Sequence, residues 1–97
     1  MYVIRNVFRC KPGKAMEVAQ KFKTAHAAMS DLGFETRVMV DEVADFWTVV
    51  AEVMVDDMAR FAEGMRERGS RDDAKQAMEG YMDLVEGGHR EVFRLVE

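Results

Sequence analysis

The chain opens with a strand pattern that changes into a helix pattern within a few residues. Residues 2–10 are rich in β-branched and aromatic side chains, which suit a pleated, half-buried strand. Pro12 has no N–H to give to a strand ladder, so the strand must end before it. Beyond Gly13 the apolar residues recur at helical spacing. This predicts a strand, a tight turn and a helix at residues 14–31, with Gly33 as the left-handed residue that ends it.

The middle of the chain repeats the strand signal. Two strands are predicted at residues 34–43 and 46–55, joined by a short polar loop of hairpin length. Asp56 and Asp57 follow, and acids in a first turn suit the positive end of the helix dipole. A second helix is therefore predicted directly after the third strand.

The predicted second helix is interrupted at one glycine, and two adjacent glycines follow it. Its helical spacing is interrupted near Gly69 and resumes after that residue. Gly87 and Gly88 are expected to end the helix, and residues 91–96 to form a short last strand. The order β-α-β-β-α-β predicts one α+β domain, residues 1–97, of the ferredoxin-like class. It has a four-stranded antiparallel sheet with helices on one face.

The predicted strands are apolar on both faces. One face of the third strand is entirely apolar, and Glu52 is the only charge on the other. Helices can cover only one side of a four-stranded sheet, and a large apolar patch left in water is rare on a monomer. The sequence therefore predicts that two copies pack sheet to sheet as a homodimer.

Composition narrows the compartment and the partners. A hydrophobic content of 48% with 33% charged residues is typical of a folded protein. The net charge of −4, with no basic cluster, argues against nucleic acid as a partner. No apolar run reaches the roughly 20 residues of a membrane span, and no signal-peptide pattern opens the chain. Cys10 is the only cysteine, which fits a reducing compartment. A cytoplasmic protein without membrane partners is expected.

Two segments carry a family resemblance. Residues 4–14, Ile-Arg-Asn-Val-Phe-Arg-Cys-Lys-Pro-Gly-Lys, resemble the first strand and turn of the dimeric α/β-barrel superfamily, and residues 84–94 resemble the end of such chains. Within this superfamily, the chain looks like the NIPSNAP-like and antibiotic-biosynthesis-monooxygenase-like groups. The resemblance implies a ferredoxin-like protomer, a sheet-to-sheet dimer and a pocket between sheet and helices. Members include cofactor-independent oxygenases of aromatic substrates, isomerases and haem-degrading enzymes.

Haem degradation is the least favoured of these activities. Asn6 lies seven residues before Gly13, as the catalytic Asn of haem-degrading members does. Those members also need a Trp just after the third strand, a position that falls near Val55 here. Their iron-binding His lies on the second helix, but no His occurs between Asp56 and Glu86. No cofactor is therefore expected.

Three polar residues are candidate catalytic groups. Asn6 and Glu52 interrupt otherwise apolar strands, so they could form a buried pair facing a pocket, with Glu52 as a base. The alternative is a structural hydrogen bond, or a salt bridge to Arg5, Arg37 or Arg94. His26 could turn toward the sheet, or be a half-buried boundary residue.

Aromatic and methionine side chains are candidates for a ligand pocket. The predicted lining residues are Trp47, Tyr81, Phe22 and Met54, and several further methionines could add adaptable apolar surface. The alternative is that all of them are ordinary core. The two histidines lack metal-ligand spacing, so no metal site is predicted.

Three functions remain open. The first is a homodimer that binds a small apolar or aromatic ligand. The second is a cofactor-independent monooxygenase or isomerase of a small aromatic substrate. The third is a purely structural dimer. Polar groups that converge on a cavity would favour the second, and an interior filled by side chains would favour the third.

Overall fold

The computed structural model describes residues 1–67 and 71–97 with their side chains, and residues 68–70 as backbone. In chain order its elements are β1 (Tyr2–Cys10), α1 (Ala15–Ala28), β2 (Glu35–Val40), β3 (Thr48–Val55), α2 (Met58–Ser70), α3 (Asp72–Ala77) and β4 (Val85–Arg94). Short 3₁₀ turns lie at Ser30–Leu32 and Tyr81–Leu84. None of the described helices is long and apolar enough to cross a lipid bilayer.

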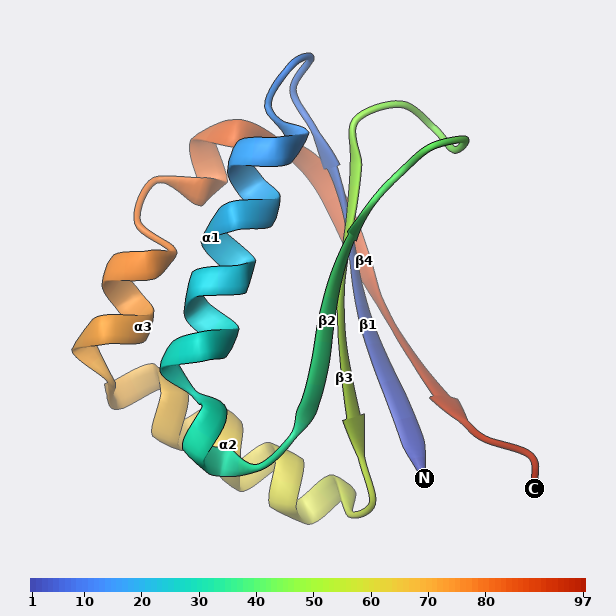
Figure 1. Ribbon diagram of the computed structural model, residues 1–97, viewed down its shortest axis with the longest axis vertical. Coiled ribbons are helices and arrows are strands. Elements are labelled where there is room, and N and C mark those ends of the chain that lie inside the picture. Colours follow the sequence, from blue (N-terminus) through green and yellow to red (C-terminus); the bar gives the residue numbers. More distant parts are fainter.

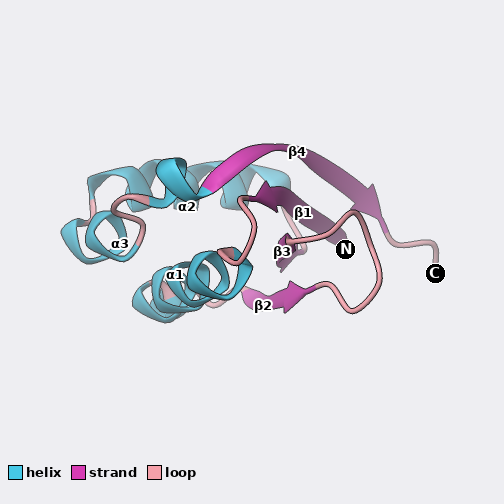
Figure 2. Cartoon of the chain, turned by 90° about the horizontal axis from the view of Figure 1, so that it is seen from above, coloured by secondary structure: helices cyan, strands magenta, loops and turns pink.

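The strands form one antiparallel sheet in the order β2-β3-β1-β4. Figures 1 and 2 show α1, α2 and α3 gathered on one face of this sheet, with no helix on the other. The predicted ferredoxin-like fold is therefore confirmed. The two central strands are β1 and β3, the most apolar of the chain, because a central strand exposes no edge to water.

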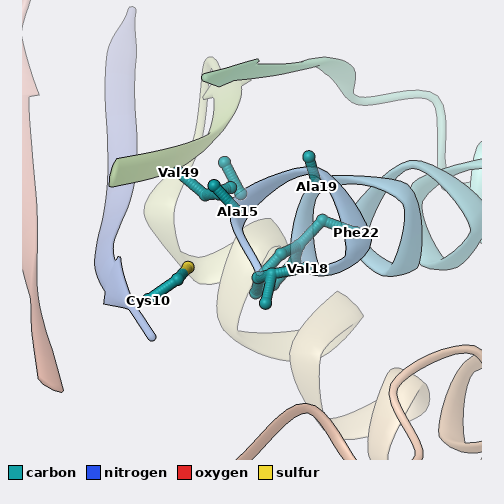
Figure 3. Close-up of a cluster of buried hydrophobic side chains, with 7 residues drawn as sticks. Cys10, Ala15, Val18, Ala19, Phe22 and Val49 are labelled. Atoms are coloured by element: carbon teal, nitrogen blue, oxygen red, sulfur yellow. The ribbon is translucent and has the colours of Figure 1, made fainter. Parts of the chain in front are cut away.

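The core lies between the sheet and α1. One face of α1 and the helix-facing residues of β1 and β3 form a close-packed cluster (Figure 3). Its buried members are Cys10, Ala15, Val18, Ala19, Phe22, Val49 and Ala51. Burial raises the pKa of the Cys10 thiol, and the nearby Asp41 carboxylate raises it further. Cys10 is therefore a core side chain and not a reactive thiol.

The third strand begins later than the sequence suggests. Phe46 and Trp47 were expected inside the strand, but both have left-handed backbone angles, with φ of 60° and 53°. They belong to the β2–β3 loop, and the ladder starts at Thr48, whose N–H donates to Asp41 Oδ1 at 2.9 Å. A pairing between the two ends of the loop therefore overrides the strand propensity of the aromatic residues.

The last strand begins six residues earlier than expected. Gly80 has φ of 79° and ends the helical segment, so Gly87 and Gly88 lie inside β4 instead of stopping a helix. Met82, which lies within the segment that was expected to be helical, is 67% exposed on the 3₁₀ turn. The reason is tertiary, because β4 pairs with β1 from Cys10 to Tyr2, and that long ladder outweighs the low strand propensity of glycine.

The second helical segment is in two pieces, as predicted. The break was expected near Gly69, and the side chains of residues 68–70 lie outside the described part of the chain. The structure separates α2 from α3 at Arg71. The Arg71 guanidinium donates to both carboxylate oxygens of Asp31, at 2.7 and 2.6 Å, and to Glu67 at 2.7 Å. It also donates to the carbonyl of Ala28 at 3.1 Å, at the end of α1. One side chain thus ties the helix junction to α1.

This tie makes part of the stability pH-dependent. The hydrogen bonds from Arg71 hold the pKa of Asp31 below its ordinary value. A depressed pKa gives stability that is present above the unfolded pKa, ~4, and is lost as the pH falls through the folded value. We expect Asp31→Asn to lower the urea midpoint at pH 7, and to differ less from wild type below pH ~3.

Urea unfolding at both pH values is the measurement. Asp83→Asn, an exposed carboxylate on the 3₁₀ turn, is the matched control and should leave the midpoint unchanged. An Asp31→Asn deficit of equal size at neutral and acid pH would show that the tie does not depend on the carboxylate charge.

Candidate functional site

A cavity of about 350 Å³ opens between the sheet and the helix layer. It is lined by residues from both strands of the β1–β4 pair, from all three helices and from the last 3₁₀ turn. These residues are Asn6, Phe8, Phe22, Met65, Ala74, Lys75, Met78, Tyr81 and Arg90. The small side chain of Ala74 helps to leave this space open.

Three aromatic rings form one wall of the cavity. Phe8 and Phe22 are stacked with centroids 5.1 Å apart, and Tyr81 meets each of them edge-on at 6.1 Å. Such offset and edge-to-face pairs are favourable beyond the area they bury. Met65 and Met78 also line the cavity, and methionine side chains are polarizable and adaptable. This wall can contact a flat apolar molecule.

The polar side of the cavity is built across the β1–β4 pair. Asn6 and Arg90 are register partners on the helix-facing side of the sheet. The Arg90 Nε–H donates to Asn6 Oδ1 at 2.7 Å. Lys75 of α3 and Tyr81 also line the cavity. The cavity therefore combines an aromatic wall with hydrogen-bond donors.

The structure gathers only some of the predicted site residues. Asn6, Phe22 and Tyr81 lie together around the cavity. Trp47 is 44% exposed in the β2–β3 loop, away from them. His26 contacts Phe22, with ring centroids 6.5 Å apart, but it lines separate hollows beside β2.

Glu52 and Met54 lie on the opposite face of the sheet from Asn6. Glu52 is paired with Arg5 and Asn6 with Ala51, and consecutive residues of a strand point to opposite faces. Asn6 and Glu52 therefore do not form a pair around one pocket. Glu52 is 4% exposed, and accepts a hydrogen bond from Arg37 Nε at 2.7 Å. Its second carboxylate oxygen lies 3.2 Å from Arg5 Nε.

These ion pairs belong to a row of charges that crosses all four strands. In strand order the row is Arg37, Glu52, Arg5 and Glu91, and each residue is the register partner of the next. Arg5 Nε is 3.8 Å from Glu91 Oε1, a longer contact than the two at Glu52. The row alternates in sign and places a buried carboxylate between two guanidinium groups. It is the salt-bridge alternative that the sequence left open for Glu52.

A double-mutant cycle measures this row. We expect Glu52→Gln to cost about 2 kcal/mol, because it weakens a charge-assisted hydrogen bond and leaves Arg5 without its nearest carboxylate. Arg37→Gln should cost less, since its side chain is 65% exposed. Urea unfolding of both variants and the double variant gives the coupling energy. Additive effects would mean that the 2.7 Å contact contributes nothing to stability.

The two cations of the cavity, Arg90 and Lys75, were not among the residues predicted from the sequence. Arg90 lies beside Asn6 because β4 begins at Val85. The sequence around Val85 has no local strand signal, and the helical segment before it ends at Gly80. Lys75 carried no signal beyond its place on a short helix. Within the described residues, no three His, Cys, Asp or Glu side chains gather to hold a metal ion.

Comparison with known proteins finds similarity in structure and not in sequence. No family model and no curated protein matches the sequence. Among solved structures, a NIPSNAP domain protein from Burkholderia xenovorans superposes with a TM-score of 0.82 at 13% identity, over 99% of this chain and 95% of that one. A NIPSNAP family protein from Agrobacterium tumefaciens gives 0.83 at 12% identity, over 99% and 93% of the two chains.

A third neighbour comes from the other group that the sequence resembles. It is a candidate antibiotic biosynthesis monooxygenase from Chloroflexus aurantiacus, with a TM-score of 0.77 at 15% identity, over 99% of this chain and 93% of that one. These neighbours are consistent with the NIPSNAP-like and antibiotic-biosynthesis-monooxygenase-like resemblance. At such low identity they establish the fold of this chain alone.

Proposed function

We propose that this protein is a small homodimer that binds a small aromatic or apolar ligand in the cavity between sheet and helices. The observation that carries the proposal is the cavity itself. Its volume, about 350 Å³, lies within the range of small-molecule sites, and its lining is mostly apolar with a few polar groups on one side. A purely structural dimer would have an interior filled by side chains, and this cavity argues against that function.

A neutral aromatic probe tests ligand binding. We expect 2-naphthamide to bind with a micromolar to millimolar Kd, and to shift amide signals of β1, α1 and α3 in two-dimensional NMR. Ala74→Leu should weaken binding at least tenfold, because the larger side chain fills the cavity. Ala62→Leu, on the exposed side of α2, is the matched control and should bind as wild type does. Binding that is unchanged in Ala74→Leu would place the probe elsewhere.

The open face of the sheet supports the dimer. Apolar side chains lie on both sides of the charged row: Met39, Val50 and Val7 on one side, and Met54, Val3 and Phe93 on the other. Phe93 is 51% exposed. The charges of the row alternate as plus, minus, plus, minus. If the row faces a reversed copy of itself, every positive charge lies opposite a negative charge. A second copy, placed by a two-fold axis along the strands, would present that reversed row.

Size-exclusion chromatography with light scattering tests the dimer. We expect a dimer for wild type at micromolar concentration, and a monomer for Phe93→Glu, which puts an unpaired charge into the apolar part of the face. Met82→Glu makes a similar change on the exposed 3₁₀ turn of the helix layer and should leave the dimer intact. A monomeric wild type would remove the dimer from the proposal without affecting the cavity.

A second candidate is a cofactor-independent monooxygenase or isomerase. It is favoured by the Asn6 amide and Tyr81 at the aromatic cavity, since these groups could orient a phenolic substrate. Glu52 cannot act in this cavity, because it lies on the other face. Turnover of a panel of small phenols, followed by oxygen uptake and mass spectrometry, tests this candidate. It requires activity in wild type that falls in Asn6→Ala.

A further inference from the structure

The charge of the cavity lining is opposite to that of the chain. The protein has 18 acidic and 14 basic residues, for a net charge of −4. The cavity nevertheless has two cationic side chains, Arg90 and Lys75, and no acid among its described lining residues. A positive site within a negative protein attracts anions, and low-dielectric apolar walls strengthen the attraction.

Neither cation has a carboxylate partner among the described residues. Other arginines of the sheet and helices, such as Arg5, Arg37 and Arg71, are paired with Asp or Glu side chains. In the part of the chain that the structure describes, no carboxylate lies within 4.0 Å of the charged nitrogens of Arg90 or Lys75. Their charges therefore remain available to a bound molecule.

Asn6 orients the arginine. The Arg90 Nε–H is held by Asn6 Oδ1 at 2.7 Å, which uses one of the five guanidinium donors. The four N–H groups on the two terminal nitrogens make no hydrogen bond with the described residues. An arginine held by Nε presents these donors as a flat fork, and a fork of this kind matches the two oxygens of a carboxylate.

The aromatic wall lies beside these donors. Phe8, Phe22 and Tyr81 line the same cavity and can contact a flat ring. We propose that the ligand is a small aromatic carboxylate, whose ring lies against this wall while Arg90, oriented by Asn6, and Lys75 hold its carboxylate. This inference rests on the proposed ligand binding and names the ligand class of the same cavity.

A matched pair of probes separates the two proposals. 2-Naphthoate and 2-naphthamide have almost the same shape, and differ in charge. We expect isothermal titration at low salt to give at least about tenfold tighter binding of the naphthoate, the factor that 1.4 kcal/mol represents. This preference should shrink with added salt, because screening weakens the ionic attraction and leaves the ring contacts unchanged.

Two variants assign the preference to the proposed residues. Arg90→Gln should remove most of the naphthoate preference and leave naphthamide binding within about twofold of wild type. Lys75→Gln, on a different element, should reduce the preference more weakly, and it keeps the test available if Arg90→Gln does not fold. Arg94→Gln is the matched control, because it removes a charge from the same strand outside the cavity lining.

The possible failures are distinguishable. Equal affinity of wild type for both probes would overturn the carboxylate inference and leave ligand binding intact. A naphthoate preference that remains in both Arg90→Gln and Lys75→Gln would overturn it as well, because other residues would then bind the carboxylate. If neither probe binds, the proposed ligand binding fails, and the carboxylate inference fails with it.

Discussion

Phe22→Ala is expected to destabilise the protein by about 3–4 kcal/mol, the largest effect that we anticipate for a single side chain. Phe22 is buried on α1, and its ring packs on both Phe8 and Tyr81. Truncation removes the transfer free energy of the ring and two aromatic contacts. The space left would join the existing cavity, and a structure relaxes only partly around such a space.

Equilibrium urea unfolding at fixed protein concentration measures this cost. Phe46→Ala is the control, because Phe46 is 77% exposed in the β2–β3 loop and should change stability by less than about 0.5 kcal/mol. A small apolar aromatic such as benzene should restore part of the lost stability of Phe22→Ala, since a ligand that binds only the folded state stabilises it. A loss below 1 kcal/mol would mean that the Phe22 ring is not part of the packed core.

Gly88→Ala should give the second largest effect, about 2–3 kcal/mol. A Cβ atom at Gly88 would lie 2.5 Å from the carbonyl oxygen of Val7 and 3.1 Å from the Phe8 ring. The first of these atoms belongs to the backbone of β1 and cannot rotate away. Relief of the overlap therefore requires β4 to shift along or away from β1.

The neighbouring glycine provides the control. A Cβ atom at Gly87 meets no atom within 4 Å, so Gly87→Ala should be close to neutral or slightly stabilising. The two variants have the same chemistry, the same strand and adjacent positions. Thermal unfolding that gives the same Tm for both would contradict the close approach of β1 and β4 at Gly88.

Much of the fold could be predicted because alternation along a strand is a local property. The assignment of Ile4, Asn6 and Phe8 to one face of β1, and of Val7 to the other, follows from their spacing alone. The order of the strands in the sheet could also be predicted without knowledge of long-range contacts, since a β-α-β-β-α-β chain has few compact arrangements. The ends of the elements were less predictable. The start of β4 is decided by pairing with β1, which overrides two glycines.

The candidate site was predictable only where its residues lie on the core-facing side of their elements. Asn6, Phe22 and Tyr81 could be named from polarity or aromatic character on such a face. Arg90 could not, because a charged residue shortly after two glycines is typical of a solvated loop. Glu52 is buried, but not in the pair with Asn6 that was one of the two hypotheses for it. Its position opposite to Asn6 follows from strand parity, and its two arginine partners required the register.

The sequence by itself determined the strands, the helices and the two apolar faces of the sheet, because hydrophobic periodicity depends only on neighbours along the chain. Only the tertiary structure decided which side chains meet. It placed Arg90 beside Asn6, residues that are 84 positions apart, at an aromatic cavity, and it aligned four charges across the sheet. Both features depend on strand register, a long-range property that no local pattern records.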